Sequence, residues 1–359
     1  MVRLTFTEAI KGYMAWRVPG GDARAARLDA RVLAEVRAAF GRSLPDAAPG
    51  ESTADALRRT FTTGAFQSPE ATRTFFSQLA DLLLPADLIA DLRAVDGRPH
   101  LVIDPSPSLA QVPWSSLLVG PERVMLGELA DVTLGVPAAV AAQARRAHDG
   151  EGALVAMDPR APGLKPVLGD SGARPRLGLE WLLDGSVGAG SFLFVGHVSA
   201  ADVELASGES STLHLSEPVT AGELLRSGWR APRRVGLVGC GSGTDLRYPE
   251  PFGLALTAIM CGAENVAATV WTLPTEAGIA EFAGGDAGAG GMEIAGGDAD
   301  AGGGPLSALA DAIAAAHAGD DPVRDLLDWQ AARARAWYAD GNPADTPAVW
   351  AAPGIFHRG

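Results

Sequence analysis

The apolar residues in the first part of the chain recur at helical spacing. Leu28, Val32, Val36 and Phe40 follow one another every four residues, which places them on one face of a helix. A second region with many apolar residues covers about residues 68–95 and is interrupted at Pro85. The pattern therefore predicts an N-terminal helical region over residues 1–95.

From His100 onward the pattern changes to short apolar runs that are separated by Pro and Gly. Short runs without alternation are typical of parallel strands that are buried on both faces. The predicted strands cover residues 101–103, 153–157, 192–195, 234–238 and 265–271.

Helices are predicted between these strands and after them. One begins at Thr220, where Glu223 completes a T-x-x-E capping box. Strands that alternate with helices indicate an α/β fold with a doubly wound, mostly parallel sheet. We expect this domain to cover residues 96–359. The other predicted helices cover residues 252–262, 306–317 and 325–338.

One segment departs from this pattern. The run AGGDAGAGGMEI is followed at once by AGGDADAGGGPL, a tandem duplication rich in Gly, Ala and Asp. It carries too little apolar surface to offset the entropy lost on ordering. Residues 283–306 are therefore predicted to form a disordered surface loop.

Composition narrows the functional classes. The chain has 359 residues, of which 47% are hydrophobic and 20% charged, as in a folded globular protein. Its formal net charge of −14 argues against nucleic acid and anionic membranes as partners. No leader-like apolar core or run of about 18 apolar residues occurs. With only two cysteines in the chain, we expect a reducing, cytoplasmic compartment.

Two loops carry the candidate chemistry, because each follows a predicted buried strand. The run FLFVGH places His197 after one strand, and GLVGCGSGTD places Cys240 after the next major one. In open parallel sheets, sites form at the carboxyl ends of strands. An imidazole there can take a proton from a thiol, and the thiolate can attack a carbonyl group. Cys261 lies in an apolar helical run and is predicted to be a core residue.

The glycines around Cys240 are compatible with two chemistries, thiol catalysis and methyl transfer. They let backbone N–H groups form an anion-binding concavity, which suits a developing oxyanion. VGCGSGTD is also similar to the glycine-rich motif of S-adenosylmethionine-dependent methyltransferases. Against that alternative, Leu237 stands where an acidic residue is usual, and the strand after it ends in no ribose-binding acid. No spacing of Cys and His resembles a metal site, and no cofactor is expected.

The order of the sequence blocks resembles the CHAT family, caspase-like proteins that are often attached to tetratricopeptide repeats in bacteria. The similarity covers about residues 80–359. The matching blocks, in the family's order, are LLLPADL, LVIDPSPSLAQVPWSSL, LVAMDP, FLFVGH, SSTLHLSEPVTAGEL, GLVGCGSG, FGLALTAIMCGAENVAATVW and PAVWAAPGI.

This resemblance implies a fold related to caspases, separases and gingipains and a cysteine endopeptidase activity. It implies that His197 is the base and Cys240 the nucleophile, and that the backbone N–H groups of Val198 and Cys240 bind the oxyanion. Two positions depart from the family's pattern: Val198 stands where Gly is typical, and Gly239 where many relatives have Ala. An inactive CHAT domain that serves as a protein-interaction module is therefore the main alternative.

The resemblance also bears on substrate and partners. It implies a protein or peptide substrate, and several caspase-like families pair a substrate Arg or Lys with an acid after the first strand of the protease core. Asp158 and Asp170 are the candidates, and Asp170 is preferred because Asp158 sits in a DP turn. Because residues 1–80 contain no evident repeat, recognition is expected to involve a separate regulatory or recognition protein.

Overall fold

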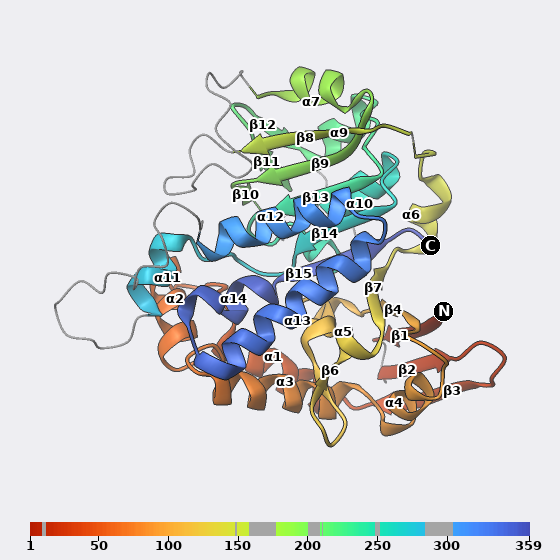
Figure 1. Ribbon diagram of the computed structural model, residues 1–359, viewed down its shortest axis with the longest axis vertical. Coiled ribbons are helices and arrows are strands. Elements are labelled where there is room, and N and C mark those ends of the chain that lie inside the picture. The colour runs from red at the N-terminus through yellow and green to blue at the C-terminus, as the bar shows by residue number, and fades with distance from the viewer. Residues whose placement is uncertain are drawn as a thin grey trace.

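A single large sheet organises the molecule. The computed structural model describes residues 1–8, 12–147, 149–157, 177–199, 209, 211–247, 252–283 and 304–359. Ten strands of the described residues form one sheet, in the order β3-β2-β1-β4-β7-β15-β14-β13-β9-β8 (Figure 1). These strands are β1 (Val2–Thr7), β2 (Gly12–Arg17), β3 (Ala23–Leu28), β4 (His100–Asp104), β7 (Asp131–Gly135), β8 (Gly152–Met157), β9 (Ala189–Val195), β13 (Arg234–Val238), β14 (Asn265–Thr269) and β15 (Pro353–His357).

Most of the sheet is parallel, as the unalternating apolar runs predict. The pairs β1–β4, β4–β7, β8–β9, β9–β13 and β13–β14 all run parallel. In β13 every residue after Arg234 is buried, because helices cover the sheet. There is no room for a side chain at Gly236 of this strand, because a Cβ there would lie 2.6 Å from Ile313 of the helix α12 (Pro305–Ala318). The predicted α/β class with a mostly parallel sheet flanked by helices is confirmed.

Helices cover the sheet along its length. Figure 1 shows α12 and α13 running across it, and α12 contacts β9 and β13 while α13 contacts β7. The helix that begins at Thr220 has the predicted capping box, with both the side-chain and the backbone bonds present. The helices after β4 are α5 (Leu126–Leu129), α6 (Ala138–Gln143), α7 (Leu179–Ser186), α9 (Ala221–Arg226), α10 (Leu254–Met260), α11 (Glu276–Phe282), α12, α13 (Pro322–Asp340) and α14 (Pro347–Trp350).

The start of the chain differs from the prediction. Residues 2–28 form three strands, not helices: β1, β2 and β3 make an antiparallel meander, and β1 joins the large sheet by pairing with β4. The sheet thus crosses the domain boundary that the sequence predicts near residue 95. The helical region begins only at Ala30. Its helices are α1 (Ala30–Ser43), α2 (Thr53–Thr62), α3 (Pro69–Leu83) and α4 (Ala86–Arg93).

Two smaller sheets complete the described structure. Strands β10 (Val198–Ser199), β11 (Thr212–His214) and β12 (Pro218–Thr220) form an antiparallel sheet that follows β9. A hairpin pairs β5 (Leu118–Val119) with β6 (Val124–Met125). Within the described ranges, every helix is too short or too polar to span a membrane. Most of the segment predicted to be a disordered loop, residues 284–303, lies outside the described residues.

Candidate active site

The two candidate catalytic residues follow neighbouring parallel strands. Val195 of β9 lies opposite Val238 of β13, and the Gly196 N–H donates to the Val238 carbonyl at 3.0 Å. His197 and Cys240 each come two residues after this pair of valines. Both loops therefore leave the sheet side by side at the carboxyl ends of their strands.

The backbone of His197 is fixed by the small sheet that follows it. The His214 N–H donates to the His197 carbonyl at 3.0 Å, which extends the pairing of β10 with β11 by one residue. The His197 side chain is exposed, whereas the side chain of Val198 is buried. On β10 and β11, Ser199 Oγ and His214 Nε2 are hydrogen-bonded at 2.5 Å.

The thiol of Cys240 is held in a partly buried position. Its Sγ donates to the Leu273 carbonyl at 3.8 Å. Burial raises the pKa of the Cys240 thiol, and the carboxylate of Asp46 raises it further, against the opposing effect of the Leu273 bond. The thiol is therefore neutral at rest, so any reaction at Sγ first needs a base.

The loop that carries Cys240 is fixed by a ladder of hydrogen bonds to the end of β14. The Gly241 N–H donates to the Trp271 carbonyl at 3.0 Å, and the Gly243 N–H donates to the Thr269 carbonyl at 2.8 Å. Ser242 Oγ accepts the Thr269 N–H at 3.0 Å. Gly241 has a φ of 59°, a left-handed conformation that favours glycine. The glycines that the sequence singles out thus set the path of this loop.

A buried acid extends the same loop toward α10. Asp245 accepts the Leu256 N–H at 2.9 Å, in the first turn of that helix. Burial raises the pKa of Asp245 to about 7, although backbone N–H groups of the helix favour its charged form. The segment from Cys240 to Asp245 is therefore fixed at both ends, by β14 and by α10.

Val198 and Gly239 pack against each other between the two loops. A Cβ placed on Gly239 would lie 2.5 Å from Val198 Cγ2 and 2.7 Å from the Gly196 carbonyl oxygen. The Val198 side chain thus occupies the space that a side chain at position 239 would need. The two departures from the CHAT pattern lie in direct contact.

Asp46, which no sequence motif indicates, also lies at this edge of the sheet. It belongs to the loop between α1 and α2, and its Oδ1 accepts the N–H of Thr272 at 2.9 Å and the hydroxyl of Thr272 at 2.7 Å. A cavity of about 460 Å³ lies beside it. Besides Asp46, the cavity's lining includes the charged and polar side chains of Arg37, Ser108, Gln111 and Arg247.

The remaining predictions concern the substrate-binding acids, the second cysteine and metal ligands. Asp158 and Asp170, the predicted substrate-binding acids, lie outside the described residues. Cys261 is buried in the core, as predicted, and burial raises the pKa of its thiol to about 11. In the described ranges, no group of three or more His, Cys, Asp or Glu side chains is arranged to hold a metal ion.

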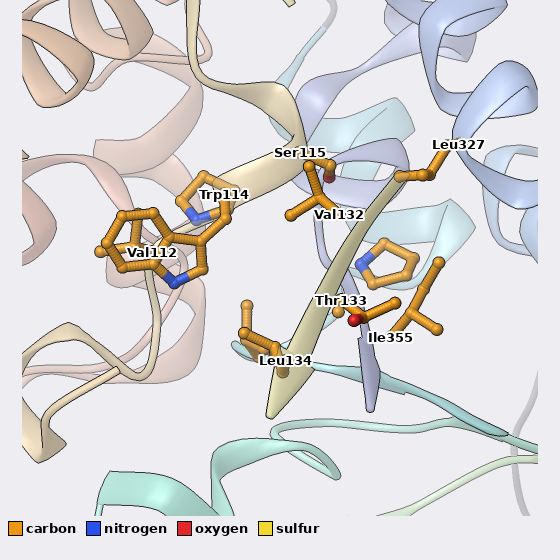
Figure 2. A pocket seen from close by; sticks show the side chains of 12 residues that line it. Val112, Trp114, Ser115, Val132, Thr133, Leu134, Leu327 and Ile355 are labelled. Carbon is orange, nitrogen blue, oxygen red and sulfur yellow. The ribbon is translucent and has the colours of Figure 1, made fainter. Parts of the chain in front are cut away.

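A second cavity is too small for a substrate. Figure 2 shows it lined by mostly apolar side chains, among them Val132 of β7, Leu327 of α13 and Ile355 of β15. Its volume is about 20 Å³, room for roughly one water molecule. It is a packing gap under the sheet and not part of the site around Cys240.

Comparison with known proteins identifies the fold. No family model matches the sequence, and no curated protein matches it. Among solved structures, the chain is similar to separase in a crystal structure of the Saccharomyces cerevisiae separase–securin complex, with a TM-score of 0.52 and 10% identity over 99% of this chain. A second structure of that complex matches with a TM-score of 0.47 and 11% identity, again over 99% of this chain.

The likeness to the first structure shows a caspase-like fold. This chain covers only 30% of the length of the separase chain that it matches. At 10% identity, the likeness concerns the arrangement of strands and helices and not individual residues.

Proposed function

We propose that the protein is a cysteine endopeptidase that cleaves a protein substrate, with Cys240 as nucleophile and His197 as base. One observation carries the proposal: a thiol and an imidazole follow directly paired positions of two adjacent parallel strands, Val238 and Val195. The caspase-like fold and the resemblance to the CHAT family support it.

The chemistry follows from the protonation state of the thiol. Because burial keeps Cys240 neutral, His197 must take the proton from Sγ as the sulfur attacks the carbonyl carbon of the scissile bond. Backbone N–H groups of Val198 and Cys240 would stabilise the oxyanion of the tetrahedral intermediate. The intermediate then collapses, His197 gives its proton to the leaving amine, and a thioester remains on Cys240.

The second half of the cycle releases the acyl group. Water loses a proton to His197 and attacks the thioester carbonyl. The thiol leaves as the carboxylic acid product forms, and Sγ regains its proton from His197. This sequence consumes one water per peptide bond and needs no cofactor or metal.

A second candidate function is a catalytically silent interaction module. The observation that favours it is the resting position of the thiol, which donates to the Leu273 carbonyl and has a raised pKa. In either case we infer a protein partner, in keeping with a solved neighbour that was crystallised with securin.

A thiol-directed peptide probe and a peptide library separate the two candidates. We expect the wild-type protein to be labelled at Cys240 and to cleave members of the library. Cys240→Ala and His197→Ala should each lose cleavage completely while they remain folded, because both residues lie on loops at strand ends. Cys261→Ala is the matched control: it removes the other thiol, should keep full activity and should cost some stability. Full activity in Cys240→Ala would exclude the proposal, and a wild-type protein that is neither labelled nor active would favour the interaction module.

The same library tests the predicted preference for a basic residue before the cleaved bond. We propose Asp170, and Asp158 as the second choice, as the acids that pair with this residue. A preference for apolar residues that does not change in Asp170→Ala would exclude that assignment.

A further inference from the structure

The loop between α1 and α2 contacts the segment that follows β14. Asp46 bonds both the N–H and the hydroxyl group of Thr272, at 2.9 and 2.7 Å. Its other oxygen, Oδ2, accepts from Gln111 Nε2 at 2.5 Å, and Gln111 also donates to the Val270 carbonyl at 3.1 Å. Hydrogen bonds to a carboxylate are stronger than those between neutral groups. Asp46 therefore holds residues 270–272 directly and through Gln111.

The opposite side of this segment faces the nucleophile. The carbonyl groups of Thr269 and Trp271 accept the N–H groups of Gly243 and Gly241. The carbonyl group of Leu273, the residue after Thr272, accepts a hydrogen bond from the Cys240 thiol. Residues 269–273 thus connect Asp46 on one side with the Cys240 loop on the other.

We propose that Asp46 is a positioning residue through which the helices α1 and α2 hold the Cys240 thiol in place. Asp46 belongs to a part of the chain that lies outside the blocks resembling the CHAT family, so its contacts link the N-terminal region to the Cys240 loop. Its consequence for catalysis rests on the proposed peptidase function, whereas its effect on the reactivity of Cys240 does not.

The Asp46 loop is itself firmly attached to α2. Arg59 of that helix donates to the carbonyl groups of Leu44 and Asp46, both at 3.0 Å. The same guanidinium forms an ion pair with Glu51 at 2.8 Å. The loop is therefore tied to α2 through its backbone, which leaves the Asp46 side chain to reach across to Thr272.

Charges around Asp46 and Cys240 set the expected electrostatic effect. Arg59 bonds to the Asp46 backbone and forms an ion pair with Glu51. Arg37 and Arg247 line the cavity beside the Asp46 side chain. His197 follows β9, the strand next to the β13 strand that precedes Cys240. The charge on Asp46 disfavours the thiolate of Cys240. Removal of that charge should therefore make the thiol more acidic.

Two variants separate the charge from the hydrogen bonds to Thr272. Asp46→Asn keeps the Oδ1 acceptor for Thr272 but removes the charge and the Oδ2 acceptor for Gln111, because its amide nitrogen would face Gln111 Nε2. Asp46→Ala also removes the bonds to Thr272. In a Cys261→Ala background, the alkylation of Cys240 by iodoacetamide is measured from pH 6 to pH 10 by mass spectrometry. For Asp46→Asn we expect the profile to move to lower pH, with alkylation at pH 7.5 about threefold faster.

Amide hydrogen exchange reports the positioning directly. In Asp46→Ala we expect exchange in the peptide covering residues 238–246 to become about tenfold faster, because the ladder from Gly241 and Gly243 to residues 269–271 loosens. Asp46→Asn keeps the bonds to Thr272 and should accelerate this exchange less than Asp46→Ala does. Asp55→Ala and Asp55→Asn, at an exposed acid of α2, are the matched controls and should change neither readout.

An unchanged alkylation profile in Asp46→Asn together with unchanged exchange of residues 238–246 in Asp46→Ala would overturn the proposal. A change in either readout that also occurs in the Asp55 variants would overturn it as well. Both measurements remain valid if the wild-type protein cleaves no peptide. Failure of the peptidase proposal is therefore distinguishable from failure of this one.

Discussion

At the scale of single residues, Val198 and Gly239 form a complementary pair between the loops that carry His197 and Cys240. Val198 is buried and lies where a Cβ at position 239 would be. The valine after His197 is thus compatible with the fold because the residue before Cys240 has no side chain. A valine at this position keeps the backbone N–H group that we propose for the oxyanion. The departure at Val198 therefore gives only weak support to an inactive domain.

This packing predicts that substitutions at the two positions are not additive. Gly239→Ala forces its Cβ against Val198 and should destabilise the protein by about 1–3 kcal/mol. Val198→Gly loses a buried side chain and should cost roughly 2–3 kcal/mol. The double variant should be more stable than the sum of these losses predicts, by about 0.5–2 kcal/mol, because each change relieves the other. Urea unfolding of the four proteins measures this coupling.

A control shows whether the coupling is specific. Val187 is 80% exposed, so Val187→Ala should change the free energy of unfolding by less than about 0.5 kcal/mol and add to Gly239→Ala without coupling. Strict additivity between Val198→Gly and Gly239→Ala would show that the contact does not matter. The Gly196 carbonyl oxygen limits the rescue, since it stays in place 2.7 Å from a Cβ at position 239.

The sequence predicts some residues of the site better than others. Cys240 and His197 can be named because each follows a recognisable buried strand. Asp46 cannot, because its role depends on a contact between two loops that are far apart in the chain, and no spacing rule covers such a contact. Leu273 contributes only a backbone carbonyl group, which any residue at this position would supply, so the sequence cannot indicate it.

At the scale of elements, the sequence predicts the buried parallel strands well and the remaining strands poorly. The predicted strand at 234–238 coincides with β13, and the predicted runs at 101–103, 153–157 and 192–195 lie within β4, β8 and β9. Continuous apolar runs are a clear signal for such strands. By contrast β7, β15 and the strands before Ala30 are missing from the prediction. In β1 a usable signal exists, since Val2, Leu4 and Phe6 are buried and alternate with more polar neighbours.

The contact between α12 and β13 places a histidine in the core. His317, in the last turn of α12, is 9% exposed, and its Nδ1 has no hydrogen-bond partner among the described residues. The Arg234 guanidinium of β13 donates to the carbonyl groups of His317 and Gly319, the latter at 2.7 Å. Burial, with a smaller effect of Arg234, lowers the pKa of His317 to about 4.

This histidine predicts a loss of stability in acid. A histidine in the unfolded chain binds a proton near pH 6.5, whereas His317 in the folded protein does so only near pH 4. At this residue the unfolded state therefore binds more protons between these values, so the contribution of His317 to the free energy of unfolding falls as the pH drops from about 6.5 to 4. His317 accounts for at most about 3 kcal/mol of this loss. Asp245, whose pKa is raised to about 7, acts in the opposite direction over the same range.

Chemical unfolding at a series of pH values tests the effect. Relative to the wild type, His317→Phe should lose less stability as the pH drops from about 6.5 to 4. His100 and His357, whose pKa values are also lowered by burial, keep their own contributions in this variant. Val187→Ala is the control, since it changes an exposed, uncharged residue and should keep the wild-type slope. An unchanged slope in His317→Phe would contradict the prediction.

At the scale of the whole molecule, the glycine-rich duplication connects two helices whose ends are already held together. Glu276 of α11 accepts the Ser307 hydroxyl of α12 at 2.9 Å, and the Arg58 guanidinium of α2 lies 5.3 Å from the centre of the Phe282 ring. These contacts position α11 and α12, the helices on either side of the duplication, without a contribution from the duplication. Longer loops add little entropic cost per residue, so a duplication can persist there without a role.

We expect that a short Gly/Ser linker in place of residues 283–304 leaves folding and peptidase activity nearly unchanged. We also expect the purified protein to stay a single chain, because no Lys or Arg occurs between Pro249 and Val323 for a basic-specific enzyme to cleave. Thermal unfolding, the peptide assay and intact-mass spectrometry check these outcomes. A cut inside this segment that disappears in Cys240→Ala would contradict the second expectation and indicate an apolar or acidic specificity.

The place of β15 in the sheet has a consequence for synthesis of the protein. This strand lies between β7 and β14, so it joins the half of the sheet built from β1–β4 and β7 to the half that carries Cys240. On a ribosome that adds roughly 5–20 residues per second, about 10–40 s pass between the release of β7 and that of β15. During that time the edge of β7 is open, and the edge of β14 opens as well once residues 265–269 have emerged. Open strand edges are templates for aggregation. Newly made protein should therefore depend on chaperones until residues 353–357 emerge and close the sheet.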